Sequence, residues 1–212
     1  MSDSPRLDLP RLLTARLLLR HVEPRDAAAH LDYVVRNREH FAPWDPPKPP
    51  DFETLGHWEN RLVREVADFA ADRGVRFGVF LHDDETTLRG RINFSQIGRG
   101  PFQSCIAGYQ IDAACEGRGL AREALAAGIE YMFNVARLHR VEANVRPENT
   151  RSRRLLERLG FRDEGLALQY LFIDGAWRDH IRMTRTNDAF EFPSPLVGEG
   201  KGERGINPSA TT

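Results

Sequence analysis

Residues 108–165 constrain the fold of this chain most, because five elements of secondary structure can be read from them in order. They read as a strand, a loop with two glycines, a helix, a second strand and a helix that starts after an N-cap residue. This alternation of strands and helices predicts a partly parallel sheet that is flanked by helices. In such sheets ligands bind beyond the C-terminal ends of the strands, so the same segment also predicts where a ligand would lie.

The loop at residues 116–121 has the sequence Glu-Gly-Arg-Gly-Leu-Ala. Its two glycines lack a Cβ, so the backbone can turn closely against an anion and point its N–H groups at it. A helix that begins near Leu120 would add free N-terminal amides and the positive end of its dipole. Together these features predict a cradle for a diphosphate. The loop is neither a Walker motif nor a Gly-x-Gly-x-x-Gly dinucleotide motif, and taken alone an ordinary strand-to-helix turn explains it equally well.

The second half of the segment favours the functional interpretation. The expected helix at residues 120–136 carries an apolar stripe, and the expected strand at residues 139–146 alternates apolar and polar residues. Asn149 precedes an amphipathic helix and is a good N-cap, either as a cap alone or as a cap that also contacts a ligand. Gly160 stands where a helix ends in a left-handed residue.

The composition narrows the class of protein. The chain has 212 residues, of which 41% are hydrophobic, and this suits one domain with a real core plus a tail. A formal net charge of −1 and a pI near 6.7 do not support a nucleic-acid binder held by bulk charge. The two cysteines fit neither a metal site nor a disulfide framework, so we expect no metal and a reducing compartment. Because there is no long apolar run and no signal-like N-terminus, we expect a cytoplasmic protein without a membrane segment.

The chain divides into three expected parts. Residues 1–10 are polar and expected to be loose, residues 11–188 form the expected domain, and residues 189–212 are expected to be a disordered tail rich in Pro, Gly and Ser. Within the domain, hydrophobic periodicity predicts strands near residues 16–20, 75–81, 88–94 and 105–111, helices near residues 24–37 and 52–73, and a proline-rich loop at residues 40–51.

Several short segments together resemble the GNAT superfamily of N-acetyltransferases. They are residues 93–95, 108–111, 116–125, 149–161 and 170–180. The loop pattern before the central helix is shared by the whole superfamily. The late run Asp-Gly-Ala-Trp-Arg-Asp-His resembles the RimJ/RimL branch, which acetylates the N-terminal amino groups of ribosomal proteins, and is most similar to its ribosomal-protein-alanine members. The resemblance spans about residues 9–188.

The resemblance implies an α+β (mixed α/β) architecture, the GNAT fold. Its twisted mixed sheet is flanked by helices and splays in the middle, between the strand that ends at Ile111 and the strand at residues 139–145. Acetyl-CoA would lie in the splay as a cosubstrate, with its pantetheine paired to strand backbone and its diphosphate held by loop amides. The cofactor-binding residues that the resemblance implies are Tyr109, Gln110, Ile111, Glu116, Gly117, Arg118, Gly119, Leu120, Ala121, Asn144, Asn149 and Ser152.

The resemblance also implies direct transfer in a ternary complex, in which a neutral amine attacks the thioester without an acyl-enzyme. Such a reaction needs a route for the amine proton and an acid for the leaving thiolate. Leu156 stands where many relatives have a tyrosine acid, so Ser152 and Tyr170 are the candidate acids, although Ser152 also suits the first turn of a helix. Glu142 and Asp179 are candidates for proton removal, with ion pairing as the competing interpretation.

Two further features concern the ligands. Glu116 replaces the usual Gln or Arg of the loop, and because a carboxylate near a diphosphate is unfavourable, we expect it to point away, toward Arg118 or Arg122. The N-terminal third supplies the wall opposite acetyl-CoA in this branch. There, Phe41 and Trp44 are expected to bind the acceptor, with core packing as the alternative.

Three hypotheses for the function remain open from the sequence. The first is transfer of an acetyl group from acetyl-CoA to the N-terminal α-amine of a protein, with a ribosomal protein as the expected partner and no direct contact with nucleic acid. The second is acetylation of a small amine such as an antibiotic or an amino acid. The third is a catalytically silent CoA-binding protein associated with ribosomes. The protein itself is expected to be a monomer or a homodimer.

Overall fold

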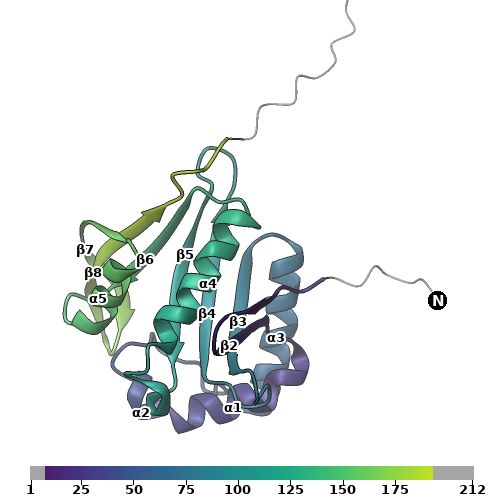
Figure 1. Ribbon diagram of the computed structural model, residues 1–212. Coiled ribbons are helices and arrows are strands. Elements are labelled where there is room, and N and C mark those ends of the chain that lie inside the picture. Colours follow the sequence, from purple (N-terminus) through teal and green to yellow (C-terminus); the bar gives the residue numbers. More distant parts are fainter. Residues whose placement is uncertain (1–7, 193–212) are drawn as a thin grey trace, which may run out of the picture.

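The computed structural model describes residues 8–192, which form one eight-stranded sheet with helices on both faces (Figure 1). The strands lie in the order β1-β2-β3-β4-β5-β6-β8-β7. Their bounds are β1 (Arg11–Leu13), β2 (Leu17–His21), β3 (Gly74–Leu81), β4 (Gly90–Gly98), β5 (Ser104–Ile111), β6 (Arg140–Val145), β7 (Arg162–Ile173) and β8 (Ala176–Thr186). The helices are α1 (Ala27–Arg36), α2 (Arg38–Phe41), α3 (Leu55–Ala70), α4 (Leu120–Asn134) and α5 (Thr150–Arg158), with 3₁₀ turns η1 (Pro24–Asp26) and η2 (Ala113–Cys115).

The sheet is mixed, as expected. Neighbouring strands are antiparallel except for β5 and β6, which are parallel and are joined through α4. A parallel pair needs a long crossover connection, and α4 provides it. The parallel arrangement inferred from residues 108–165 is therefore confirmed.

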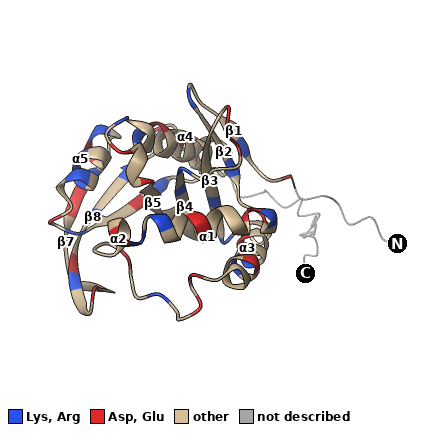
Figure 2. Cartoon of the chain, turned by 90° about the horizontal axis from the view of Figure 1, so that it is seen from below, with Lys and Arg blue, Asp and Glu red and all other residues tan. Residues whose placement is uncertain are grey.

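Helices cover both faces of the sheet (Figures 1 and 2), and the hydrophobic core lies beneath them on each face. On one face, α4 and α5 pack against the strands, and Leu125, Ile129 and Leu156 are fully buried there. On the other face, α1 and α3 cover a second cluster that contains Trp58 and Leu62. The two layers leave the middle strands enclosed from both sides, so a ligand that reaches them must enter where strands part.

The strands part between β5 and β6. Their Cα pairing runs only from Ser104 opposite Arg140 to Ile106 opposite Glu142. β5 nevertheless continues to Ile111 and β6 to Val145. The last residues of β5 therefore have no partner on the β6 side, and the expected splay is confirmed.

Two differences from the expected elements shape the region beside the splay. Residues 38–41 are helical, so Phe41 belongs to α2 and the proline-rich loop begins after it. α3 begins at Leu55 rather than at residue 52, because Thr54 caps it and accepts a hydrogen bond from the amide of His57 at 3.2 Å.

The strands β7 and β8 form a long hairpin that periodicity did not indicate. β7 is the edge strand of the sheet, and most of its residues are exposed on both faces. An edge strand of this kind lacks the alternation of buried and exposed residues from which strands are read. The hairpin carries Tyr170 and Asp179, which the resemblance had singled out.

The predicted loose N-terminus and disordered tail fall largely outside the described part of the chain, which omits residues 1–7 and 193–212. Residues 8–10 precede β1, and residues 189–192 follow β8.

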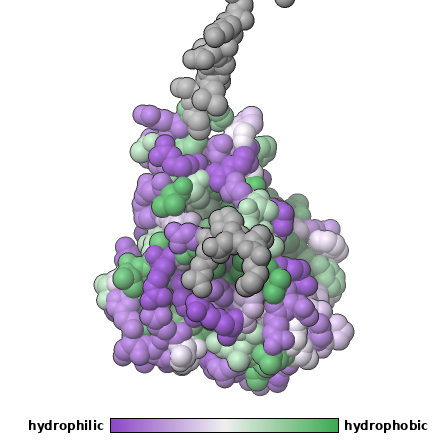
Figure 3. All heavy atoms as spheres, turned by 90° about the vertical axis from the view of Figure 1, so that its right-hand side faces the viewer, coloured by the Kyte–Doolittle hydropathy of each residue, from purple (hydrophilic) through white to green (hydrophobic). Residues whose placement is uncertain are grey.

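Figure 3 shows the side of the molecule that lies on the right in Figure 1. Among the residues that can be seen there, hydrophilic ones predominate and hydrophobic ones are scattered. This face therefore offers little hydrophobic surface to a partner.

Candidate active site

A cavity of about 430 Å³ opens where β5 and β6 part. Its wall combines parts of β4, β5 and β6, the proline-rich loop at residues 42–50 and the first turn of α5. The predicted site residues on this wall are Phe41, Trp44, Tyr109, Gln110, Asn144, Asn149 and Ser152. The structure thus brings together predictions from segments that are far apart in the chain.

The glycine loop has the backbone shape that an anion cradle requires. Gly117 has φ of +70° and Gly119 has φ of +77°, a region that residues with a Cβ rarely adopt. Gly119 is also the N-cap residue of α4 and offers no side chain to the first-turn amides. Among the described residues, the amides of Gly117, Arg118 and Gly119 donate no hydrogen bond. These amides are therefore free to bind a diphosphate.

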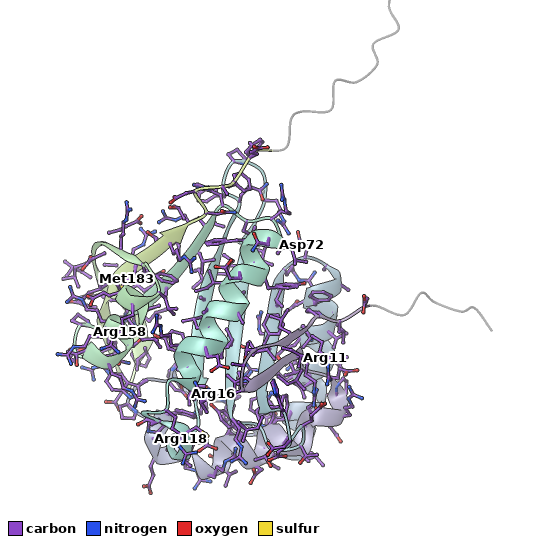
Figure 4. All side chains as sticks on the ribbon, in the orientation of Figure 1. Arg11, Arg16, Asp72, Arg118, Arg158 and Met183 are labelled. Carbon is purple, nitrogen blue, oxygen red and sulfur yellow. The ribbon has the colours of Figure 1, made fainter. Side chains whose placement is uncertain are left out.

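Side chains at the N-terminal end of α4 hold the loop in place. The Arg16 guanidinium donates to the carbonyl of Arg118 at 2.9 Å and to the carboxylate of Glu123 at 2.7 Å. Figure 4 shows Arg16 and Arg118 together at this end of the helix. Among the other predicted coenzyme residues, Leu120 and Ala121 begin α4, and Ile111 ends β5.

Glu116 does not pair with Arg118 or Arg122, so this expectation is wrong. Its carboxylate instead forms an ion pair with Arg151 at the start of α5 and lies 3.1 Å from Nε2 of His40 in α2. Both partners lie far from Glu116 in sequence, and the fold alone brings them to it. These contacts link the glycine loop to elements on both faces of the sheet.

Ser152 lies at the centre of a short hydrogen-bonded chain. The amide oxygen of Asn149 accepts from the Ser152 amide at 3.0 Å, so Asn149 is the N-cap of α5. The Tyr109 hydroxyl lies 2.6 Å from Ser152 Oγ. Burial raises the pKa of Tyr109 to about 12, so its hydroxyl stays protonated and can donate to the serine oxygen. Ser152 is thereby oriented from two sides.

The proline-rich loop is fastened across the cavity at two points. Gln110 on β5 donates from its side-chain amide to Asp45 at 2.6 Å. Arg146, which follows β6, donates to the carbonyl of Pro43 at 2.7 Å, and its guanidinium lies 5.5 Å from the centre of the Trp44 ring. Trp44 keeps 39% of its surface exposed, so it can contact a further molecule.

Phe41 is packed differently from Trp44. It is buried, and its ring lies 5.5 Å from the ring of Tyr33 in the cluster beneath α1. Phe41 therefore supports the wall of the cavity from behind while contributing to the core. The core packing of Phe41 is confirmed, and its contact with the acceptor stays a prediction.

The three remaining catalytic candidates do not reach the cavity wall. Glu142 forms ion pairs with Arg140 and Arg182, and Asp179 accepts a hydrogen bond from the amide of Gln169. These contacts favour the structural alternative for both carboxylates. The Tyr170 hydroxyl accepts from the side-chain amide of Asn144 at 3.3 Å, so it touches a wall residue from outside the cavity.

Sequence reasoning missed a polar group on the acceptor side of the sheet. Arg91 of β4 is buried, donates to Glu65 of α3 at 3.4 Å and stacks with its guanidinium 5.0 Å from the Trp58 ring. Burial acts to raise the pKa of Glu65, but Arg91 and Arg61 outweigh it and leave that pKa lowered. Glu65 therefore stays ionised.

A signal for this group was present in the sequence of β4. Arg91, Asn93 and Ser95 alternate with the apolar Ile92 and Phe94, so the polar residues share one face of the strand. Alternation cannot show which face borders a cavity. The topology decides that point.

Comparisons with known proteins agree with this geometry. Residues 16–162 match the family model described as acetyltransferase (GNAT) domain. The chain belongs to the GNAT family. This GNAT protein is 42% identical to the [Ribosomal protein uS5]-alanine N-acetyltransferase of Escherichia coli, over 81% of its own length and 88% of the relative.

Two solved structures resemble this GNAT protein closely. One is the ribosomal-protein-S5-alanine acetyltransferase of Vibrio fischeri, with a TM-score of 0.82 and 34% identity over 86% of this chain and 99% of the other. The second is Mycobacterium smegmatis RimJ in complex with CoA-disulfide, with a TM-score of 0.77 and 34% identity over 84% and 86% of the two chains. The expected family and fold are confirmed.

This GNAT protein is an acetyl-CoA-dependent N-acetyltransferase, and its residues fit that cosubstrate. The free amides of the glycine loop suit the diphosphate, and the unpaired end of β5 offers backbone groups to the pantetheine amides. Within residues 8–192, no group of three or more His, Cys, Asp or Glu side chains is arranged to hold a metal ion. None of the helices in this part of the chain is long and apolar enough to cross a membrane.

Proposed function

We propose that this N-acetyltransferase modifies the N-terminal α-amino group of a ribosomal protein. The observation that carries the proposal is the 42% identity to a ribosomal-protein-alanine N-acetyltransferase over 171 residues, a stretch long enough to include both walls of the cavity. An enzyme of this kind meets its substrate where ribosomal proteins are made, so we place it in the cytoplasm. Its formal net charge of −1 suits contact with a protein N-terminus rather than with nucleic acid.

Different residues of the cleft are proposed to bind acetyl-CoA and to position it for the reaction. Acetyl-CoA, when bound, supplies an activated acetyl thioester. The amides of Gly117, Arg118 and Gly119 hold the diphosphate, and the unpaired end of β5 aligns the pantetheine arm. An N-terminal α-amine has a pKa of about 7.7–8.0, so a useful fraction is neutral without a strong base.

Ser152 is the group proposed to protonate the departing sulfur. The Asn149 cap fixes the backbone of Ser152, and the Tyr109 hydroxyl lies 2.6 Å from Ser152 Oγ, where it can donate to that oxygen. With its oxygen satisfied in this way, the serine can direct its own proton toward the cavity. The amine proton leaves to water through the open mouth of the cavity.

The experiment is acetyl transfer from acetyl-CoA by the purified protein, followed as free thiol. The acceptors are a short peptide that begins with Ala and follows a ribosomal-protein N-terminus, the same peptide with its amino group already acetylated, spermidine and an aminoglycoside. We expect thiol release with the free peptide alone and, by mass spectrometry, one acetyl group on its α-nitrogen. Release only with a small amine would replace the proposal by small-amine acetylation, and CoA binding without release from any acceptor would indicate a silent binding protein.

A further inference from the structure

Two asparagines on the cavity wall have amide oxygens without a hydrogen-bond partner. They are Asn93 on β4 and Asn144 on β6. Each oxygen has less than 1 Å² of exposed surface and no donor within residues 8–192 reaches it, so a ligand donor meets it only after the asparagine side chain rotates toward the cavity. Buried polar atoms in proteins are nearly always paired, so two orphaned acceptors in one cavity call for a donor from outside the chain.

The register places the two asparagines at one level of the sheet. Asn93 lies opposite Gly108 of β5. Ile106 pairs with Glu142, so Gly108 and Asn144, each two residues further along parallel strands, also lie level and on the same face. Asn93 and Asn144 therefore stand on either side of Gly108, with the parting of β5 and β6 between Gly108 and Asn144.

Gly108 leaves the space between the asparagines open. A Cβ built on it would have no heavy atom within 4 Å, apart from those of neighbouring residues along the chain. Asn93 and Asn144 belong to the strands on either side of Gly108, so this gap separates them. The gap lies at the point where β5 and β6 part.

We propose that Asn93 and Asn144 form the amine subsite of this acetyltransferase. Each amide oxygen accepts one N–H of a neutral primary amine, and the lone pair of that amine remains free to face the splay. The inference deepens the proposed function, since it takes the acceptor to be a primary α-amine. It also assigns Asn144 to the acceptor rather than to the coenzyme, with which the sequence resemblance had grouped it.

Tyr170 and the buried cations complete this arrangement. The Tyr170 hydroxyl accepts from the side-chain nitrogen of Asn144, which directs the Asn144 oxygen elsewhere. Arg91 lies two residues before Asn93 on the same face, and Arg146 two residues after Asn144. The carboxylates around the cavity are paired, Glu65 with Arg91, Glu148 with Arg146 and Asp45 with Lys48. The two asparagine oxygens carry no charge, so the subsite adds no anion that would hold the amine as the ammonium ion, a form that cannot attack.

The number of N–H bonds changes during the reaction in a way that fits two acceptors. A new N–C bond forms to the acetyl carbon while the C–S bond breaks. The sulfur takes a proton from Ser152, the nitrogen loses one of its protons to water, and water returns a proton to Ser152, so the enzyme is unchanged at the end. The amide product keeps one N–H, so it satisfies one asparagine oxygen and leaves the other unpaired. The product is therefore held less well than the substrate.

The test compares primary and secondary amines in a mutant cycle. The substrates are the Ala-initiated peptide and the same peptide with N-methylalanine at its start, which has one N–H fewer. We expect the unmodified enzyme to prefer the primary amine by tenfold or more in kcat/KM. In Asn93→Ala or Asn144→Ala we expect kcat/KM for the primary amine to fall about tenfold, with a much smaller loss for the N-methyl peptide, because a lost hydrogen bond to a buried oxygen is worth about this factor.

The controls separate a lost subsite from a damaged fold. Asn134→Ala, at an exposed position at the end of α4, should leave kcat/KM unchanged for both peptides. Gly108→Ala fits the open space without strain and should lower use of both peptides by blocking the gap. Asn93→Gln and Asn144→Gln keep a neutral amide oxygen and should retain part of the preference if either alanine variant proves unstable.

A binding measurement tests the subsite without turnover. Calorimetry in the presence of CoA compares the Ala-initiated peptide with the same peptide whose amino group is replaced by hydrogen. We expect tighter binding of the amino peptide by the unmodified enzyme and equal binding of the two peptides by the alanine variants. A preference that is the same in all variants, in turnover and in binding, would overturn the subsite.

Failure of the proposed function gives a different result. If the enzyme acetylates only a small amine, the peptide proposal falls, and the same cycle run with that amine and its N-methyl derivative decides the subsite. If no acceptor is acetylated and the amino group adds nothing to peptide binding, the subsite is rejected as well.

Discussion

The two sides of the cleft are built in different ways. On the coenzyme side, the functional groups are backbone amides and close neighbours in sequence, such as Gly117 with Gly119 and Asn149 with Ser152. On the acceptor side they are side chains from distant segments, such as Gln110 with Asp45 and Arg146 with Pro43. The groups proposed to bind the coenzyme are carried by every residue, whereas the groups proposed to bind the acceptor are carried by particular residues.

This difference separates what a family shares from what one member selects. Backbone amides at a helix start bind a diphosphate whatever the neighbouring side chains are, provided that glycine permits the turn. Side chains on β4, β6 and the loop at residues 42–50 can change without disturbing that turn. We expect substitutions on the two sides to affect different kinetic constants.

The largest expected effect lies on the coenzyme side, at Ser152. Ser152→Ala removes the proposed acid and should lower kcat about 100-fold with little change in either KM, because positioned proton donors contribute about this factor. Tyr109→Phe should lower kcat in the same direction by less, and the double variant should be no worse than Ser152→Ala. Steady-state kinetics measures these effects, with Thr150→Ala in the same helical turn as the control. Full kcat in both Ser152→Ala and Tyr109→Phe would contradict the role of Ser152 as the acid.

A change in the glycine loop should act on coenzyme binding alone. Gly119→Val places a branched residue at φ of +77° and should weaken CoA binding about 30-fold, since it displaces amides that each contribute roughly 1.5–3 kcal/mol to an anion. Gly100→Val creates similar strain at φ of +62° in the turn between β4 and β5. Calorimetry that found equal loss of CoA binding in both variants would show a general effect of instability.

Acid should destabilise the acceptor side of the cleft more than the coenzyme side, because His30 is buried beside Trp58. Burial lowers the pKa of His30 to about 3, and its ring stacks on Trp58 at 5.1 Å. The folded-state pKa lies below the unfolded value of about 6.5, so the stabilisation is complete above pH 6.5 and is lost as the pH falls toward 3. Lowering the pH from 7.5 to 5 should therefore reduce the free energy of unfolding by about 2 kcal/mol through His30.

Urea unfolding of the unmodified protein and of His30→Phe at both pH values measures this effect. The variant should lose less stability than the unmodified protein over this interval. An identical pH dependence of the two proteins would show that His30 is not the responsible group.

The smallest effect should come from the fastening of the proline-rich loop. Arg146→Lys removes the planar group that donates to Pro43 and stacks on Trp44, so KM for the acceptor should rise about fivefold while KM for acetyl-CoA stays constant. Arg182→Lys serves as the control, because Arg182 forms an exposed ion pair with Glu142 on the same sheet. A rise in KM for acetyl-CoA would show that the loop belongs to the coenzyme side instead.

The predictability of each part from the sequence follows the same division. The glycine loop, the Asn149 cap and the left-handed Gly160 depend on residues within a few positions of one another, and the structure has all three. The partners of Glu116 were predicted wrongly because Arg151 and His40 are neighbours only in the folded chain. The hairpin of β7 and β8 was not apparent because an exposed edge strand carries no alternation.

The sequence by itself determined the order of strands and helices around residues 108–165 and the anion-binding turn, and both follow from local rules of backbone geometry and hydrophobic period. The place of the splay was implied by the resemblance to the GNAT superfamily. Only the tertiary structure decided that Asn93, Gly108 and Asn144 line one cavity and that Arg91 lies buried beside Trp58. Contacts of this kind depend on the register between strands and on which face of the sheet each helix covers, and neither is encoded within a short stretch of chain.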